Sequence, residues 1–68
     1  MKNGILTKRE HEIFELLVKN QSTKEIADKL KISEKTVRNH ISNTIQKLDS
    51  KGRSQAIVEL IKMGEIKI

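Results

Sequence analysis

The chain of 68 residues contains no cysteine, proline, tryptophan or tyrosine, and Phe14 is its one aromatic residue. Without cysteine it has neither disulfides nor a thiolate-based metal centre. A single core is marginal at this size, and short chains gain stability from efficient helix packing or from a partner subunit. The sequence therefore predicts one small domain spanning residues 1–68, and a dimer is a reasonable expectation.

Long apolar runs are also absent. No stretch approaches the roughly 18 residues that a membrane span needs, and the N-terminus "MKNGILTKRE" lacks the apolar core of a signal peptide. We therefore expect no membrane partner and a location in the cytoplasm, on the nucleoid if the partner is DNA.

The residues that would support catalysis or metal binding are few. "HEIFE" at residues 11–15 is similar to a zinc-protease helix, but Glu15 stands where the second histidine is required. His40 has no convincing nucleophile and orienting acid to act with as a general base. None of the three glycines lies in a phosphate-binding loop. We expect no enzymatic activity, no metal and no cofactor.

The charge of the chain is predominantly positive. Fourteen Lys plus Arg against nine Asp plus Glu give a formal net charge of +5. This suits a negatively charged partner, either nucleic acid or an anionic surface. Charge alone does not choose between them.

Four amphipathic segments can be read from apolar spacing and helix-start signals. "TKRE" and "STKE" are capping boxes beginning at Thr7 and Ser22. Asn20, whose residue type tolerates the left-handed conformation, ends the first segment. Ser33 is a third N-cap, and "DSKG" separates the last segment, which Gly64 ends. The tail "EIKI" alternates, but four residues do not settle its state. These signals predict helices over about residues 8–19, a two-turn segment ending before Lys31, about 34–48 and about 54–63. The fold class is all-α, a compact four-helix domain.

The second and third predicted helices form the pattern of a helix-turn-helix. They are joined by a turn of about three residues, and Ala27 is small enough to let them approach closely. Helix hairpins of this kind also occur in proteins that never touch DNA, so the pattern by itself is only moderately specific.

Rotation at 100° per residue divides the third helix into two sides. The expected core stripe comprises Val37, Ile41, Ile45 and Leu48. Arg38, Asn39 and Ser42 fall on the other side, and Arg and Asn can pair bidentately with guanine and adenine in the major groove. Rotation alone leaves two interpretations open, a solvated polar face and a surface that reads bases.

The residues around this polar side favour the second interpretation, a surface that reads DNA bases. Thr23 and Lys24 begin the second helix and Lys35 and Thr36 the third, where helix N-termini already favour phosphate. The window 34–48 holds three cations and one acid, whereas a merely solvated face more often mixes the two.

The segments "LTKREHEIFELL", "STKEIADKLKISEKTVRNHISNTIQKL" and "KGRSQAIVELIKMG" resemble, in order and spacing, the LuxR-type helix-turn-helix family. The match runs from Leu6 to about Gly64. The resemblance implies a sequence-specific transcription regulator that binds double-stranded DNA as a homodimer, with RNA polymerase as a further partner. It also points to control of late sporulation or spore-coat genes.

The resemblance implies roles for individual residues. The motif covers about residues 23–42. Base-reading positions fall on Arg38, Asn39 and Ser42, and phosphate contacts on Thr23, Lys24, Lys35, Thr36, His40 and Lys47. Glu10 and Arg53 match a structural ion pair of the family. The fourth helix, about 54–63, is implied as the dimerisation surface, with Ile57, Leu60 and Ile61 at the interface.

Two other functions stay open at the level of sequence. One is a small protein-interaction adaptor that docks its fourth helix on another regulator and uses its basic face only for solubility. The other is a nucleoid protein that binds DNA without a preferred site.

Overall fold

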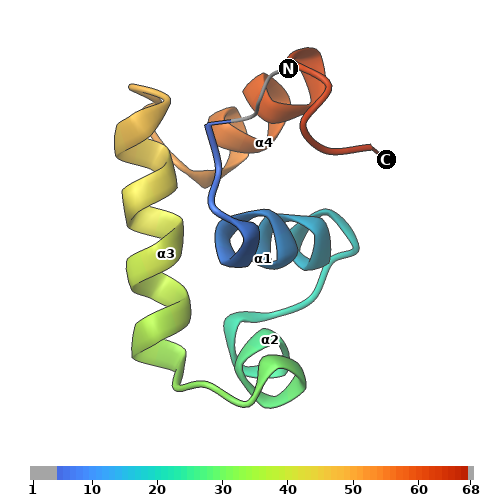
Figure 1. Cartoon of the computed structure of the whole chain (residues 1–68), viewed down its shortest axis with the longest axis vertical. Helices are drawn as coiled ribbons and strands as arrows, with labels where there is room; N and C mark the ends of the chain where they lie inside the picture. The colour runs from blue at the N-terminus through green and yellow to red at the C-terminus, as the bar shows by residue number, and fades with distance from the viewer. Residues whose placement is uncertain (1–4, 68) are drawn as a thin grey trace.

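The computed structural model describes residues 5–67, and these form four helices. They are α1 (Lys8–Val18), α2 (Thr23–Leu30), α3 (Glu34–Lys47) and α4 (Arg53–Lys62), with no strand among the described residues. In Figure 1, α3 stands along one edge of the molecule, with the other three helices on its inner side. The predicted all-α fold with a helix-turn-helix is confirmed, with the numbered helix bounds within one residue of their predicted positions.

Three helices begin at the side-chain caps predicted from the sequence. Thr7 Oγ1 accepts from the backbone N–H of Glu10 at 3.1 Å, and Ser22 Oγ accepts from Glu25 at 3.1 Å. Both glutamates return a bond to the backbone N–H of the capping residue, which completes the two capping boxes. Ser33 Oγ accepts from the N–H of Thr36 at 3.0 Å. These starting points are set by local chemistry.

A left-handed residue follows each of the four helices. Asn20 (φ 68°) and Gly64 (φ 77°) were expected from their residue types, whereas Lys31 (φ 59°) and Asp49 (φ 53°) were not. Lys31 lies in the turn between α2 and α3, where the next residue's N–H bonds back to the carbonyl of Ala27 at 3.0 Å. This bond helps to hold a conformation that costs about 1 kcal/mol for a non-glycine residue. It therefore stabilises the turn that sets the orientation of α3 relative to α2.

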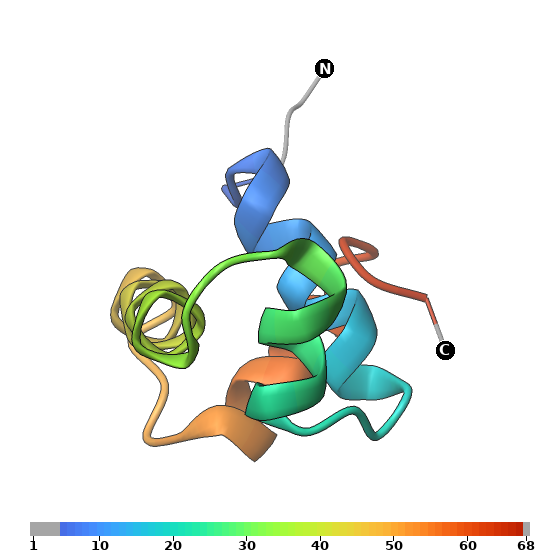
Figure 2. The ribbon, with the colours of Figure 1, turned by 90° about the horizontal axis from the view of Figure 1, so that it is seen from below.

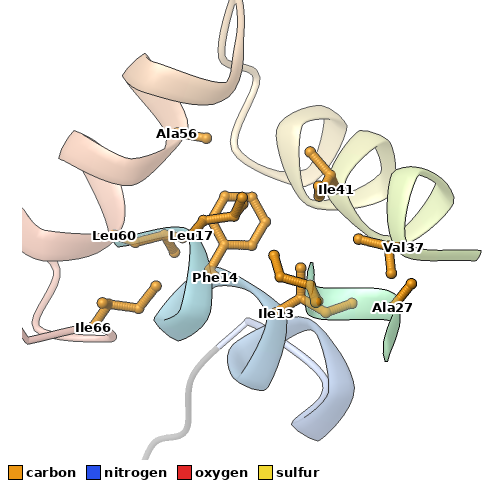
Figure 3. Close-up of a cluster of buried hydrophobic side chains, with 10 residues drawn as sticks. Ile13, Phe14, Leu17, Ala27, Val37, Ile41, Ala56, Leu60 and Ile66 are labelled. Carbon is orange, nitrogen blue, oxygen red and sulfur yellow. The ribbon is translucent and has the colours of Figure 1, made fainter. Parts of the chain in front are cut away.

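One apolar core joins all four helices and the C-terminal tail. Phe14 lies among side chains from α1, α3 and α4 in Figure 3. The buried hydrophobic residues of this core are Ile13, Phe14, Leu17, Ile26, Ala27, Val37, Ile41, Ala56, Leu60 and Ile66. Ile66, only 2% exposed, belongs to the tail "EIKI", whose state the sequence left undecided.

The inner side of α3 differs from the predicted stripe. Val37 and Ile41 are buried as expected, but Ile45 and Leu48 are only partly buried. Thr44 is fully buried instead, and its hydroxyl donates to the carbonyl of His40 at 2.9 Å. The bond within the helix satisfies the hydroxyl, so a threonine can occupy a core position.

The prediction of Leu60 as a dimer-interface residue was wrong. Its exposed fraction is 0%, and Figure 3 shows it directed towards the core beside Leu17. Because a residue enclosed within one protomer has no surface to offer a second copy, Leu60 contributes to folding. None of the helices in residues 5–67 combines the length and the apolar character of a membrane span.

Candidate nucleic-acid interface

The helix-turn-helix is built by close packing of α2 on α3. Ala27 of α2 is 4% exposed and lies beside Val37 of α3 in Figure 3. Lys31, Ile32 and Ser33 separate the two helices. The small side chain at the contact and the short turn predicted from the sequence are both present.

The outer face of α3, comprising Lys35, Arg38, Asn39 and Ser42, is exposed along its length. Arg38 and Asn39 each lie three or four positions from both Lys35 and Ser42, so the four residues form one stripe on the helix. Figure 2 looks nearly along α3 and shows the helix at the side of the molecule, as in Figure 1. A helix anchored on one side and polar on the other can enter a major groove.

Arg38 carries an ion pair that the sequence reading did not identify. Its Nη1 lies 3.6 Å from Glu34 Oε1, one helical turn towards the N-terminus. Both side chains are about half exposed. The spacing of four residues, with the acid nearer the N-terminus, is the signal that could have revealed this pair.

The predicted phosphate ligands at the helix starts occupy the first turns of α2 and α3. Lys24 and Lys35 are exposed, while Thr23 and Thr36 are half-buried. The hydroxyl of Thr36 lies 2.9 Å from that of Ser33. First-turn N–H groups and the positive end of each helix dipole make such positions suitable for an anion.

Lys47, another predicted phosphate ligand, is engaged within the protein. Its Nζ lies 2.6 Å from Glu10 Oε1 and 3.4 Å from the carbonyl oxygen of Ile5. Glu10 is 3% exposed, and the same carboxylate oxygen accepts from the backbone N–H of Thr7 at 3.0 Å. The pair therefore ties the C-terminal end of α3 to the start of α1.

The charge state of Glu10 follows from these contacts. Burial opposes ionisation, but the hydrogen bonds from Lys47 and Thr7 and the charge of Lys47 outweigh it, so the pKa of Glu10 is lowered. The carboxylate is therefore ionised at neutral pH, and Lys47 balances its charge.

The predicted ion pair between Glu10 and Arg53 was wrong in its partner. Within residues 5–67, the base that contacts Glu10 is Lys47, and Arg53 is exposed at the first position of α4. The long Lys47 side chain reaches Glu10 because α1 packs on α3, a contact that sequence spacing does not reveal.

The two histidines have different surroundings. His40, a predicted phosphate ligand, is half-buried on α3. His11 on α1 places Nε2 2.7 Å from the backbone carbonyl oxygen of Glu65, joining the tail to α1 across 54 residues. His11 therefore has a structural contact. Within the described residues, no group of three or more metal-ligating side chains comes together.

Comparisons with known proteins agree with this geometry. The model of the family described as "Bacterial regulatory proteins, luxR family" matches residues 4–60. The spore germination protein GerE of Bacillus subtilis (strain 168) is 69% identical over 64 residues, which cover 94% of this chain and 86% of that protein. A solved structure described as transcription factor GerE superposes with a TM-score of 0.93 at 66% identity, covering 96% of this chain and 97% of the other.

Longer regulators match through one part of their length. The transcriptional regulatory protein DegU of Brevibacillus brevis is 48% identical over 64 residues, covering 94% of this chain but only 27% of DegU. The family resemblance predicted from the sequence is confirmed. The chain belongs to the LuxR family of bacterial regulatory proteins, and it is a DNA-binding transcription regulator of that family.

Proposed function

We propose that this regulator binds double-stranded DNA as a homodimer, with α3 of each protomer in the major groove. The observation that carries the proposal is the outer face of α3, where Arg38, Asn39 and Ser42 are exposed opposite a buried side. Arg38 and Asn39 supply bidentate readout of guanine and adenine, and the Ser42 hydroxyl can donate or accept.

Phosphate contacts fix the register of α3 in this proposal. Lys24 and Lys35 are exposed, and together with Thr23 and Thr36 they occupy the first turns of α2 and α3. His40 is a secondary candidate because it is half-buried. Lys47 has a smaller role, since its ammonium group is bound to Glu10.

Dimerisation is proposed through one side of α4. Ile57 and Ile61 are half-buried, and Val58 is 49% exposed. The three lie within about a third of the helix circumference, on the side next to the buried Leu60. An apolar stripe left partly exposed on a terminal helix can be covered by the same helix of a second copy.

The biological role that we propose is control of late sporulation or spore-coat genes, acting on the nucleoid in the cytoplasm. The 69% identity to a spore germination protein supports this role. RNA polymerase is the further partner that such a regulator requires if it activates transcription.

Base reading is tested by comparing Asn39→Ala with Lys35→Ala. Loss of Asn39 should cost roughly 1–3 kcal/mol at particular base pairs. Loss of Lys35 should weaken binding to all sequences similarly and reduce the salt slope by about 1. The measurement is fluorescence titration on a selected site, its single-base variants and mixed-sequence duplex at several salt concentrations. Identical, uniform losses for both variants would show that α3 does not read bases directly.

Dimerisation is tested by a matched pair of substitutions, one on α4 and one at the residue that follows it. Val58 and Met63 are both 49% exposed, but Met63 lies well away from the proposed stripe. Val58→Asp should shift sedimentation equilibrium towards monomer, and Met63→Asp should leave it unchanged. A dimer that persists in Val58→Asp would show that α4 does not form the interface.

The alternative function of a protein-interaction adaptor makes a different prediction. An adaptor would bind mixed-sequence DNA negligibly at low and at high salt.

A further inference from the structure

One acidic residue lies next to the basic residues on the outer face of α3. Glu34, the first residue of α3, is the only Asp or Glu between residues 34 and 48. Its carboxylate lies 3.6 Å from the guanidinium of Arg38, the residue to which the proposed function assigns guanine readout. An acid so close to the proposed DNA contact weakens attraction to phosphate, which calls for a physical reason.

Folding accounts for an acid at this position but not for its contact with Arg38. The side chains of Glu34 and Arg38 are 47% and 59% exposed, and ion pairs at such positions contribute little to stability. Ser33 already caps the helix through its bond to Thr36. A negative charge at the first helical position favours the dipole, but this effect does not depend on Arg38.

The consequence for DNA binding depends on the sequence that α3 meets. At a wrong site, Arg38 finds no pair of guanine acceptors, and its alternative partner is a phosphate. Glu34 competes with that phosphate for the guanidinium and is itself repelled by the DNA backbone. At the right site, two bonds to guanine O6 and N7 replace the contact with Glu34. Glu34 can then accept from the amino group of a neighbouring cytosine.

We infer that Glu34 is a specificity-determining residue, which withholds Arg38 from phosphate and thereby weakens binding to wrong sequences more than to the right one. This inference rests on the proposed function, because it requires α3 to lie in the groove. Discrimination of this kind works by penalising the competing complex as well as by favouring the intended one.

The test is Glu34→Gln, which keeps the size of the side chain and removes its charge. A preferred site is first selected from random duplexes with the unchanged protein. Dissociation constants are then measured for that site and for mixed-sequence duplex over a series of salt concentrations. We expect Glu34→Gln to tighten mixed-sequence binding roughly fivefold at low salt and to steepen its salt slope by about 0.9 per protomer, the contribution of one additional phosphate contact. Binding to the selected site should change much less, so the specificity ratio falls.

Glu12→Gln is the matched control. The Glu12 side chain on α1 is 39% exposed and is paired with an arginine, Arg9, at 3.2 Å. Its replacement changes the net charge equally and also frees a guanidinium. It lies outside α2 and α3, and we expect it to shift both duplexes by the same small factor. Thermal unfolding of both variants establishes that each is folded at the assay temperature.

Arg38→Gln, alone and combined with Glu34→Gln, tests whether Glu34→Gln changes DNA binding through Arg38. In the Arg38→Gln background the effect of Glu34→Gln on mixed-sequence binding should shrink, because the guanidinium that would be released is absent. An unchanged specificity ratio in Glu34→Gln, or a shift equal to that of Glu12→Gln, overturns the inference and leaves the proposed function standing. If the unchanged protein selects no site at all, both fail together.

Discussion

The C-terminal end of α3 is tied to α1 by the ion pair between Lys47 and a buried Glu10, at 2.6 Å. Its N-terminal end carries a pair within the helix, Glu34 with Arg38, longer at 3.6 Å and exposed on both sides. Both pairs join an acidic side chain to a basic side chain of α3. The first pair connects α3 to α1, whereas the second lies entirely within α3. The ion pair at the C-terminal, anchored end therefore holds α3 against α1, while the pair at the N-terminal, exchangeable end leaves Arg38 able to change partners.

This difference suits a helix that must be held in place and still bind a ligand. A buried pair between helices is costly to break because the acid left behind cannot be solvated. An exposed pair can be replaced by another partner at little cost. The proposed reading residues are exposed along α3 from the exchangeable end, and one side of the helix faces no other element in either view (Figures 1 and 2).

The largest effect on stability is expected from Lys47→Ala. It leaves the Glu10 carboxylate buried with the hydrogen bond from the N–H of Thr7 but without its ion-pair partner, and should lower the free energy of unfolding by about 2–3 kcal/mol. Urea denaturation measures this change. At the other end, Lys35→Ala should cost under about 0.5 kcal/mol. Equal losses at the two ends would contradict the distinction between anchored and exchangeable ends.

The next largest effect is expected from acidification, which should remove the stability that the ion pair at the anchored end contributes. Because the pKa of Glu10 is lowered in the folded protein, its contribution is fully present above the unfolded value of 4.5 and is lost as pH falls through the lower folded pKa. The same direction holds for Glu25, whose pKa is lowered by hydrogen bonds from Ser22. Thermal unfolding of Glu10→Gln between pH 3 and 7 should show reduced dependence on pH.

Glu25→Gln is the control for this titration. It removes only the share of the acid dependence that arises at the start of α2, so the two variants together separate the contributions. The anchoring role of Glu10 would be refuted by a Glu10→Gln protein whose stability falls with acid as steeply as that of the unchanged chain.

A smaller effect than that of Lys47→Ala is expected from Ser33→Ala at the exchangeable end. It removes the bond from the Thr36 N–H, and loss of such a cap costs about 1 kcal/mol. Urea denaturation should show this loss, and Ser33→Asp, which retains a cap acceptor, should restore most of it. A cost for Ser33→Ala as large as that of Lys47→Ala would mean that the two ends are equally constrained.

Features that depend on near neighbours in sequence were predicted well. The three capped helix starts, the left-handed Asn20 and Gly64 and the exposed side of α3 all follow from contacts within one or two turns. The pair between Glu34 and Arg38 is of the same local kind and could have been found by spacing. These interactions need no knowledge of how the helices pack.

The errors concern residues whose role depends on distant segments. Leu60 was assigned to the dimer interface by resemblance, yet the packing of α4 buries it completely. Arg53 was paired with Glu10 by resemblance, while the contact of α1 with α3 brings Lys47 to that carboxylate. Ile66 could not be assigned from a tail of four residues, but it fills a place in the core.

The sequence by itself determined the four helices, their starting points and the polar stripe on α3, because caps, periodicity and helix-face spacing are local properties of the chain. Tertiary structure decided which basic side chains of α3 remain available to DNA and which are paired within the protein. Lys47 and Lys35 are equivalent as residue types and differ only in whether a buried carboxylate lies within reach. That distinction arises because packing α1 against α3 removes Glu10 from water, and a buried charge requires a partner.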